Sequence, residues 1–277
     1  ENIDDNVGRL LTALDEQGLA KSTIVVFLTD NGGTAGVPHF NAGMRGGKTS
    51  VHEGGCRVPL IVRWPGKLES RTVEPLASHI DLYPTLLDLC GVSIPNANAL
   101  DGVSLRPLLA GEPTDWPQRT IFTHNSISAY NRYPGAVRTD RYRLVRTIRG
   151  RQGGSSATPN DKTAPPWQLF DMEADPGEKK DLAKQHPDIV AELSKQYEAW
   201  YDDISSQPLT RSPIQVGHEK ENPVTLHAPQ AYFEGKLRFD HGPGFAHDWL
   251  TDWDSEGEKV WFDIEVVQPG AYEIAMH

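Results

Sequence analysis

Two polar residues that directly follow an apolar run, Asp30 and Asn31, have the side chains of a candidate cation site. The run Thr23–Thr29 is rich in β-branched residues without alternation, which predicts a strand buried on both faces, as in a parallel sheet under helices. Asp30-Asn31-Gly32-Gly33 follows directly. Ligands of open α/β sheets bind outside the carboxyl ends of the strands, and carboxylate and amide oxygens suit Ca²⁺ or Mg²⁺. Asp30 and Asn31 are therefore candidate metal ligands, although these residues also suit a strand-ending turn.

A second candidate is the glycine-rich segment 45–59, whose cations Arg45, Lys48 and Arg57 could hold an oxyanion. Its glycines would let the backbone approach a ligand closely. The string Gly-Gly-Lys-Thr is similar to a P-loop, but that motif needs a glycine at position 42, where Ala42 stands, and a strand before it and a helix after it. We therefore reject nucleotide binding, and the alternative to an anion site is a glycine-rich surface loop.

Histidines and arginines give weaker signals. His39 and His52 flank Lys48, and surface positions are expected for both, while His124 follows the predicted strand 119–123 and could reach a cleft. Residues 132–151 hold seven arginines against one acid, Asp140, in a chain of net charge −11. This cluster could steer an anionic polymer, or it could be a hairpin face paired with acids elsewhere. The seven are Arg132, Arg138, Arg141, Arg143, Arg146, Arg149 and Arg151.

The elements that must position these residues alternate between strand and helix. Apolar residues at helical spacing predict a helix over residues 3–17, ended by Gly18, and a second helix over 79–90, while 58–64 reads as another strand. The class is therefore α/β. Short strands over 119–123, 135–139, 142–148 and 167–172, with a helix over 187–203, predict a small antiparallel α+β subdomain.

The C-terminal part has the alternating pattern of a β-sandwich. Residues 259–267 alternate apolar and polar side chains, and a return strand is expected over 271–276, but too few strands remain to close a sandwich. Trp249 and Trp253 could stack on sugars or lie in a core. The predicted boundaries are 1–118 for the α/β part, 119–204 for the α+β subdomain, 205–223 for a linker and 224–277 for the partial sandwich.

Composition excludes several classes of protein. With 38% hydrophobic and 23% charged residues, the 277-residue chain is ordinary for a globular protein. No run approaches eighteen apolar residues, so no membrane span is expected, and the net charge of −11 argues against nucleic-acid binding. Two cysteines exclude a disulfide scaffold, and both are expected to be small buried side chains. The chain starts without Met or a signal peptide and ends within a strand-like pattern, so both ends are interpreted as cut.

Taken in order over residues 1–200, these strings resemble the sulfatase family of the alkaline-phosphatase superfamily. Each string alone is weak, whereas the ordered set is specific. The strings are Ile3–Leu11, Thr23–Gly32, Arg45-Gly-Gly-Lys48, Glu53-Gly-Gly, Arg57-Val-Pro59, Trp64-Pro-Gly66, Asp81–Leu86, Asp101–Leu105, Leu169-Phe-Asp-Met172 and Asp175-Pro-Gly-Glu178.

The resemblance implies a fold, a reaction and site residues. It implies the C-terminal part of an alkaline-phosphatase-like layered sheet and the hydrolysis of sulfate esters by a formylglycine nucleophile with Ca²⁺, Mg²⁺ being less favoured. Asp30 and Asn31 would be metal ligands, and Lys48 would be the catalytic cation that contacts the sulfate. Lys48, Arg45, His124 and Arg138 are the candidate substrate-binding residues. A sulfated glycan and an extracytoplasmic location are expected.

The chain departs from the family pattern in one large respect. It has no Cys/Ser-x-Pro-x-Arg string from which a formylglycine is made, so the nucleophile is expected in an N-terminal half that is missing. Two ligands and one cation are half of a site, and the isolated chain is expected to be inactive. The alternatives are a non-catalytic, glycan-binding module and a phosphatase or phosphonate hydrolase of the same superfamily, which the Lys48–Glu53 segment disfavours.

Overall fold

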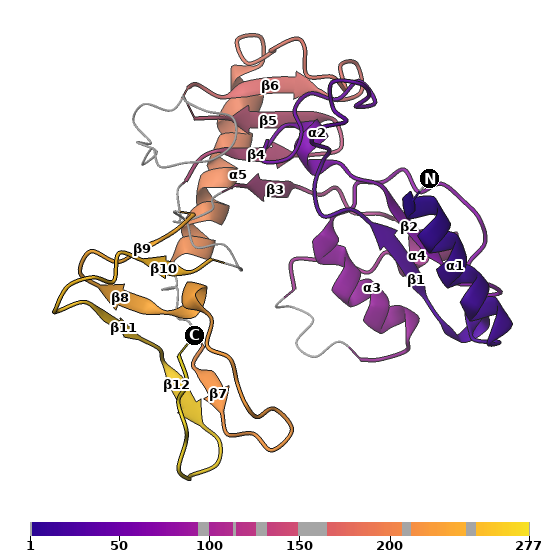
Figure 1. Cartoon of the computed structure of the whole chain (residues 1–277). Helices are drawn as coiled ribbons and strands as arrows, with labels where there is room; N and C mark the ends of the chain where they lie inside the picture. The colour runs from indigo at the N-terminus through magenta and orange to yellow at the C-terminus, as the bar shows by residue number, and fades with distance from the viewer. Residues whose placement is uncertain are drawn as a thin grey trace. The chain divides into compact units, whose positions relative to one another are not determined.

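The computed structural model describes residues 2–93, 100–112, 115–125, 132–148, 165–206, 212–241 and 248–276. These residues fall into two compact units, one up to Tyr201 and one from Asp202 onward, and each is described by itself (Figure 1). None of the helices among the described residues is long and apolar enough to cross a bilayer. The class is α/β, as the sequence predicts. The strand pairs of the described residues are antiparallel except for β7 with β12, which is parallel.

The first part of the N-terminal unit joins helices to a strand pair. Its elements are α1 (Asn2–Glu16), η1 (Ala20–Ser22), β1 (Val25–Leu28), α2 (Glu53–Cys56), β2 (Leu60–Arg63), η2 (His79–Asp81), α3 (Leu82–Leu89) and α4 (Arg106–Ala110). Gly18 follows α1 with φ +68° and ends it as predicted. The pair of β1 and β2 is antiparallel, so the expected parallel arrangement is wrong for these two strands. The 31 residues between them contain only the four-residue α2, too little helix for a parallel crossover.

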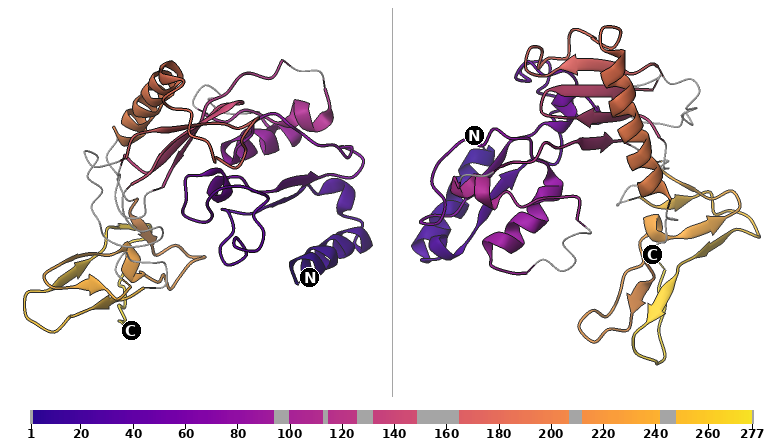
Figure 2. Two further views of the ribbon diagram at one scale, coloured as in Figure 1. Left: turned by 90° about the horizontal axis from the view of Figure 1, so that it is seen from above. Right: turned by 180° about the vertical axis from the view of Figure 1, so that it is seen from behind.

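The second part of this unit is a four-stranded antiparallel sheet with α5 (Pro187–Ser205) lying across it (Figures 1 and 2). The strands are β3 (Ile121–His124), β4 (Gly135–Arg138), β5 (Tyr142–Arg146) and β6 (Gln168–Asp171), in that order. The predicted hairpin turn between β4 and β5 is confirmed, because the Thr139 N–H donates to the Tyr142 carbonyl at 2.9 Å.

The two faces of this sheet bury different residues. Register places Phe122, Val137, Leu144 and Leu169 on one face, where Phe122 stacks on Trp200 of α5 with ring centroids 5.0 Å apart. The other face carries a cluster that includes Val51, from the glycine-rich segment. That cluster is Val51, Ala136, Val145, Phe170 and Met172. The sheet therefore holds the glycine-rich segment on the face opposite α5.

The C-terminal unit consists of strand pairs. Its elements are β7 (Ile214–Val216), η5 (Ala228–Gln230), β8 (Tyr232–Glu234), β9 (Arg238–Phe239), β10 (Leu250–Thr251), β11 (Lys259–Trp261) and β12 (Ile264–Val266). They pair as β8 with β11, β9 with β10 and β7 with β12. The expected strand 259–267 is broken between β11 and β12, the expected return strand 271–276 is not a strand, and the expected linker contains β7.

Candidate functional site

The Asp30-Asn31 turn is fixed by the glycines that follow it. Gly32 donates its N–H to the Gly55 carbonyl at 3.1 Å. A Cβ at Gly32 would stand 1.8 Å from the Gly54 carbonyl oxygen, so only glycine fits there. Asp30 is exposed, and Asn31 is half-buried, with its Nδ2 donating to the Gly32 carbonyl at 3.0 Å. The turn therefore packs backbone to backbone against the glycine-rich segment.

The same packing brings Lys48 to the turn. The Lys48 N–H donates to the Gly33 carbonyl at 2.9 Å, and its side chain is exposed. A Cβ at Gly47 would stand 2.8 Å from that carbonyl oxygen. Asn41 supports the loop by donating its Nδ2 to the carbonyls of Met44 at 2.8 Å and Gly46 at 2.7 Å. The structure thus brings the backbone of Lys48 to the turn that contains the two predicted metal ligands.

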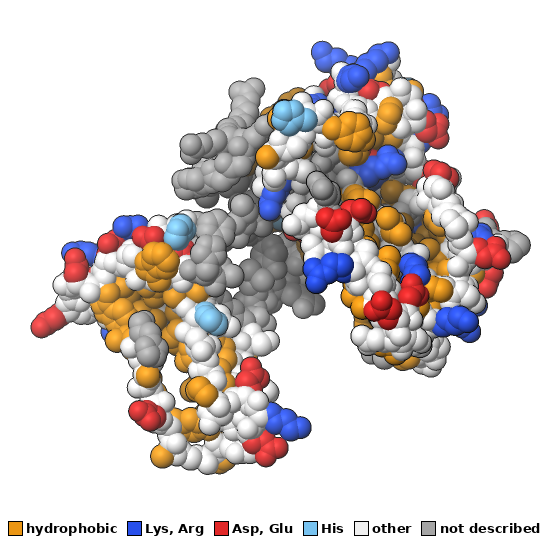
Figure 3. All heavy atoms as spheres, turned by 45° about the vertical axis from the view of Figure 1, so that its right-hand side comes forward, with side chains coloured by type: hydrophobic (Ala, Val, Ile, Leu, Met, Phe, Trp, Pro, Cys, Tyr) orange, Lys and Arg blue, Asp and Glu red, His pale blue; other side chains and the backbone are white. Residues whose placement is uncertain are grey.

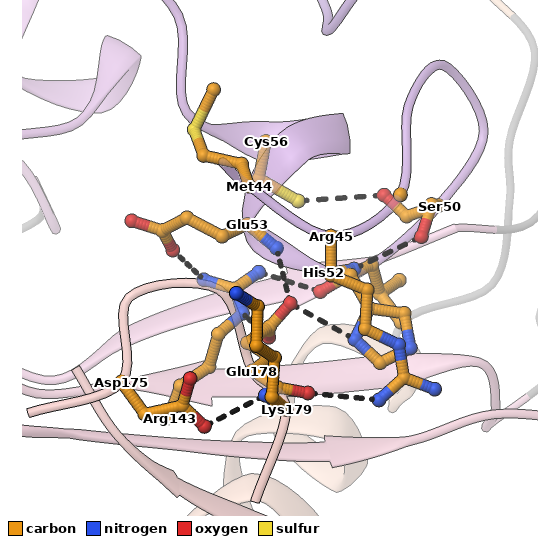
Figure 4. Close-up of polar contacts among 12 residues, drawn as sticks. Met44, Arg45, Ser50, His52, Glu53, Cys56, Arg143, Asp175, Glu178 and Lys179 are labelled. Carbon is orange, nitrogen blue, oxygen red and sulfur yellow. Dashed lines mark hydrogen bonds and ion pairs between the residues drawn. The ribbon is translucent and has the colours of Figure 1, made fainter. Parts of the chain in front are cut away.

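Buried charges hold the glycine-rich segment to the sheet (Figure 4). Arg143 of β5, only 2% exposed, donates from Nη1 to Glu53 Oε2 at 2.9 Å and from Nη2 to the Val51 carbonyl at 2.5 Å. Its Nε lies 3.2 Å from Glu178 Oε1, an ion pair without hydrogen-bond geometry. Glu178 Oε2 lies 3.1 Å from His52 Nδ1 and accepts the Glu53 N–H at 3.1 Å. Since buried charges must be paired, these contacts constrain one another.

Arg45 and Arg138 lie around this network. Arg45 is exposed, donates from Nη1 to the Glu178 carbonyl at 3.3 Å, and has its guanidinium 5.8 Å from the centre of the Phe170 ring. Arg138 Nε is 3.8 Å from Glu53 Oε2, and burial lowers the pKa of Arg138 from its usual value. Both arginines therefore stand near the Lys48 loop, and their role in substrate binding stays a prediction.

His124 ends β3 and packs edge-on against Tyr201 of α5, with ring centroids 5.5 Å apart. Its neighbour Asn125 donates a side-chain hydrogen bond to the Thr49 carbonyl, next to Lys48. The predicted approach of this strand end to the site thus takes place through Asn125, a residue that the sequence reasoning missed. No pattern in the sequence distinguished Asn125 from other polar loop residues.

The expectation of a surface position is wrong for His52, which is 6% exposed, while His39 is exposed as expected. The reason is its contact with Glu178. The buried carboxylate of Glu178 needs polar partners, and the ring of His52 is one of them. Sequence reasoning also missed Glu53, Arg143 and Glu178 as a network. A usable signal existed, because an arginine-rich hairpin with one local acid requires acids from elsewhere.

The arginine cluster is largely paired. Arg149 and Arg151 lie outside the described residues. Each of the other five has a partner: Arg132 pairs with Glu198, Arg138 and Arg143 with Glu53, Arg141 with Asp171, and Arg146 lies 4.2 Å from the Tyr133 ring centre. The structure therefore favours the interpretation of a hairpin face paired with acids elsewhere, for the arginines that it describes.

Neither cysteine has the surroundings of a nucleophile. Burial raises the pKa of the Cys56 thiol, which keeps it protonated, and its Sγ lies 3.5 Å from the Ser50 carbonyl. Cys90 is exposed, so the expectation that both cysteines are buried is wrong for this one. It follows the last residue of α3 as the C-cap of that helix.

The residues at the turn fit a hard cation in kind but not in number. Asp30 offers a carboxylate, and Asn31 offers its amide oxygen because its Nδ2 is the atom bonded to Gly32. Ca²⁺ takes six to eight oxygens. Within the described residues, no group of three or more His, Cys, Asp or Glu side chains could hold a metal ion. A tight site would therefore need further oxygens in addition to these two.

The tryptophans of the C-terminal unit are half exposed. Trp249 is 53% exposed and Trp253 is 51% exposed, and Figure 3 shows hydrophobic side chains at the surface of this unit. Trp261 stacks on Tyr232 with centroids 5.7 Å apart. A core position is wrong for Trp249 and Trp253, and their binding of sugar stays a prediction.

Comparison with known proteins gives the family. A model of the sulfatase family matches residues 1–92, and a model described as "N-sulphoglucosamine sulphohydrolase, C-terminal" matches residues 47–203, more than half of the chain. Bovine arylsulfatase A (Bos taurus) is 36% identical over 200 residues, covering 69% of this chain and 39% of that protein. The chain thus spans about two fifths of this relative.

Solved structures of similar fold point to the same family. One, titled as a complex with its substrate D-glucosamine-2-N,6-O-disulfate, has a TM-score of 0.51 and 26% identity, and the match covers 73% of this chain and 39% of that one. A phosphonate monoester hydrolase from Silicibacter pomeroyi has a TM-score of 0.52 and 31% identity, covering 72% and 38%. On the matched family models and this shared fold, the chain belongs to the sulfatase family of the alkaline-phosphatase superfamily.

Proposed function

We propose that the protein to which this chain belongs hydrolyses sulfate esters and that the chain supplies Lys48, Asp30 and Asn31 to the active site. The observation that supports the proposal is the hydrogen bond of 2.9 Å from the Lys48 N–H to the Gly33 carbonyl, which joins the backbone of the Lys48 loop to the turn that contains Asp30 and Asn31. A sulfuryl group in transfer concentrates negative charge on its oxygens. The Lys48 ammonium is a cation that could stabilise this charge.

Lys48 differs in its task from Asp30 and Asn31 in this proposal. The Lys48 ammonium contacts a sulfate oxygen and stabilises the leaving-group oxygen as the S–O bond breaks. Asp30 and Asn31 would hold Ca²⁺, which as a Lewis acid polarises sulfate oxygens. The nucleophile, expected to be a formylglycine, comes from polypeptide other than this chain, because Cys56 and Cys90 stand in no Cys-x-Pro-x-Arg string.

The substrate class we propose is a sulfated glycan. Support comes from the structural neighbour titled with a sulfated glucosamine as its substrate. Such a substrate and an extracytoplasmic location stay predictions for this protein. The Arg45 and Arg138 guanidinium groups near the Lys48 loop are the candidates for contacts with further anionic groups of the glycan.

An assay of the full-length protein tests the proposal. We expect hydrolysis of an aryl sulfate that is lost on chelation of divalent cations and restored by Ca²⁺. Turnover of an aryl sulfate undiminished by Lys48→Ala would contradict the assignment of Lys48, and no turnover of any sulfate ester would contradict the function itself.

A second candidate, phosphonate or phosphate monoester hydrolysis, is favoured by the match to the Silicibacter pomeroyi enzyme. Aryl phosphate and phenylphosphonate monoesters, run beside the aryl sulfate at equal concentration, discriminate between the two. A kcat/KM that is higher for the phosphorus substrates would select this candidate.

A further inference from the structure

Glu178 combines complete burial with an unusual backbone. It is 1% exposed, and its φ of +53° lies in the left-handed region, which disfavours residues other than glycine. The turn before it is fixed by Asp175, whose carbonyl accepts the Glu178 N–H at 3.0 Å and whose carboxylate accepts the N–H groups of Lys179 and Lys180 at 2.7 Å each. A strained, buried carboxylate persists only where its surroundings hold it in place.

Glu178 contacts residues of the glycine-rich segment before and after Lys48. Its carbonyl accepts from Arg45, three residues before Lys48, while its carboxylate contacts His52 and Glu53, four and five residues after. Figure 4 shows these contacts converging on Glu178 from the same segment. The enclosed loop is closed by the Gly54 N–H, which donates to the Arg45 carbonyl at 2.8 Å.

The negative charge of Glu178 also helps to neutralise the buried guanidinium group of Arg143. Arg143, 3% exposed in its side chain, lies between two carboxylates, those of Glu53 and Glu178. Glu53 shares a second cation, Arg138, at 3.8 Å. Loss of charge at Glu178 leaves Arg143 with Glu53 alone and removes the charged acceptor beside His52. The attachment of the segment to the 175–178 turn is then reduced to neutral contacts and the Arg45 contact with the Glu178 carbonyl.

We propose that Glu178 is a positioning residue that holds the Lys48 loop, and with it the turn of Asp30 and Asn31, in the geometry needed for attack on the sulfate ester. This inference rests on the proposed function for its catalytic consequence. The structural claim, that Glu178 fixes the Lys48 loop, does not depend on the proposed function. One measurement therefore tests the structural claim and a second tests the catalytic consequence.

The first measurement is hydrogen exchange on the full-length protein. Glu178→Gln is expected to raise exchange of the Lys48 and Gly54 amides at least about tenfold, because local opening of the loop becomes easier. The amides of β4 and β5 should stay protected. The matched control is Asp81→Asn, which removes another buried carboxylate, one bonded to Arg119 at 2.7 Å, without touching the loop. Equal exchange in the loop of both variants would overturn the inference.

The second measurement is a double-mutant cycle in the full-length protein. Misplacement of a catalytic group by about 1 Å can cost roughly 100-fold in rate. We expect Glu178→Gln to lower kcat for an aryl sulfate at least about tenfold, with KM changed by less than about threefold. In the Lys48→Ala background, the same change should lower kcat by less than about twofold, because Glu178 acts through Lys48.

Asp81→Asn serves as the control here too, and its effect on kcat should be small in both backgrounds. If Glu178→Gln lowers kcat by the same factor in the Lys48→Ala background as in the wild-type protein, the two residues act independently. That result would indicate a general loss of structure and overturn the inference. If Glu178→Gln does not fold, Glu178→Asp keeps the charge but is too short for all its contacts, and the same two outcomes apply. A wild-type protein without sulfatase activity would contradict the proposed function, while the exchange result would still decide the role of Glu178.

Discussion

At the scale of single residues, Lys48 combines a fixed backbone with an exposed side chain. Lys48→Ala should therefore lower kcat/KM of the full-length protein at least about 100-fold, as loss of a group that stabilises transition-state charge does. The free energy of unfolding should change by no more than about 0.5 kcal/mol, because Lys48 is exposed. Lys195→Ala, at an exposed position of α5, is the control and should change neither.

Tyr133 makes a residue-scale prediction about pH. Burial and the hydrogen bond to Glu198 raise its pKa to about 12. The unfolded chain then releases this proton at a lower pH than the folded chain, so stability is present below the ordinary tyrosine pKa and is lost as pH rises towards 12.

Urea unfolding at pH 9.5 and 11.5 checks this. The wild-type protein should lose more stability between these two values than Tyr133→Phe, which has no hydroxyl to titrate. An equal loss in both proteins would show that Tyr133 does not contribute.

At the scale of elements, glycines mark where backbone must approach backbone. Gly32→Ala should destabilise the chain by more than about 3 kcal/mol, because the new Cβ would meet the Gly54 carbonyl oxygen at 1.8 Å. Gly8→Ala, in α1, should stabilise it by about 0.5–1 kcal/mol, because nothing lies within 4 Å and alanine favours a helix. Thermal unfolding of the two variants gives the comparison, and similar shifts in both would contradict the packing described.

Elements with strong local patterns could be predicted from sequence, and contacts between distant segments could not. The helical spacing of Ile3, Val7 and Leu10 defines α1 almost to the residue, and Gly18 ends it. The antiparallel partner of β1 is set by the chain between the strands and not by the apolar pattern.

The candidate site divides in the same way. Asp30, Asn31 and Lys48 could be selected because their types and order match a family pattern. His52 was misplaced because its burial depends on Glu178, 126 residues later, and no local pattern contains that partner.

At the scale of the whole molecule, the chain spans about two fifths of a related sulfatase and contains two proposed metal ligands and one proposed catalytic cation. We therefore expect the isolated chain to show no turnover of sulfate esters and to bind Ca²⁺ no more tightly than about millimolar, since tight sites need six or more oxygens. Isothermal titration and a steady-state assay measure the two quantities. A clear rate from pure isolated chain would refute this expectation.

The span between the Lys48 loop and Glu178 also has a consequence for synthesis on the ribosome. The contacts of Arg45, His52 and Glu53 are made with a residue that emerges 125 to 133 positions later. Contacts between residues distant in sequence form slowly, because the chain loses conformational entropy in closing the loop before the contacts stabilise it. A nascent chain that has not yet reached Glu178 would thus carry the Lys48 loop without these contacts, so assembly of the loop is a late event that waits for synthesis of the 175–178 turn.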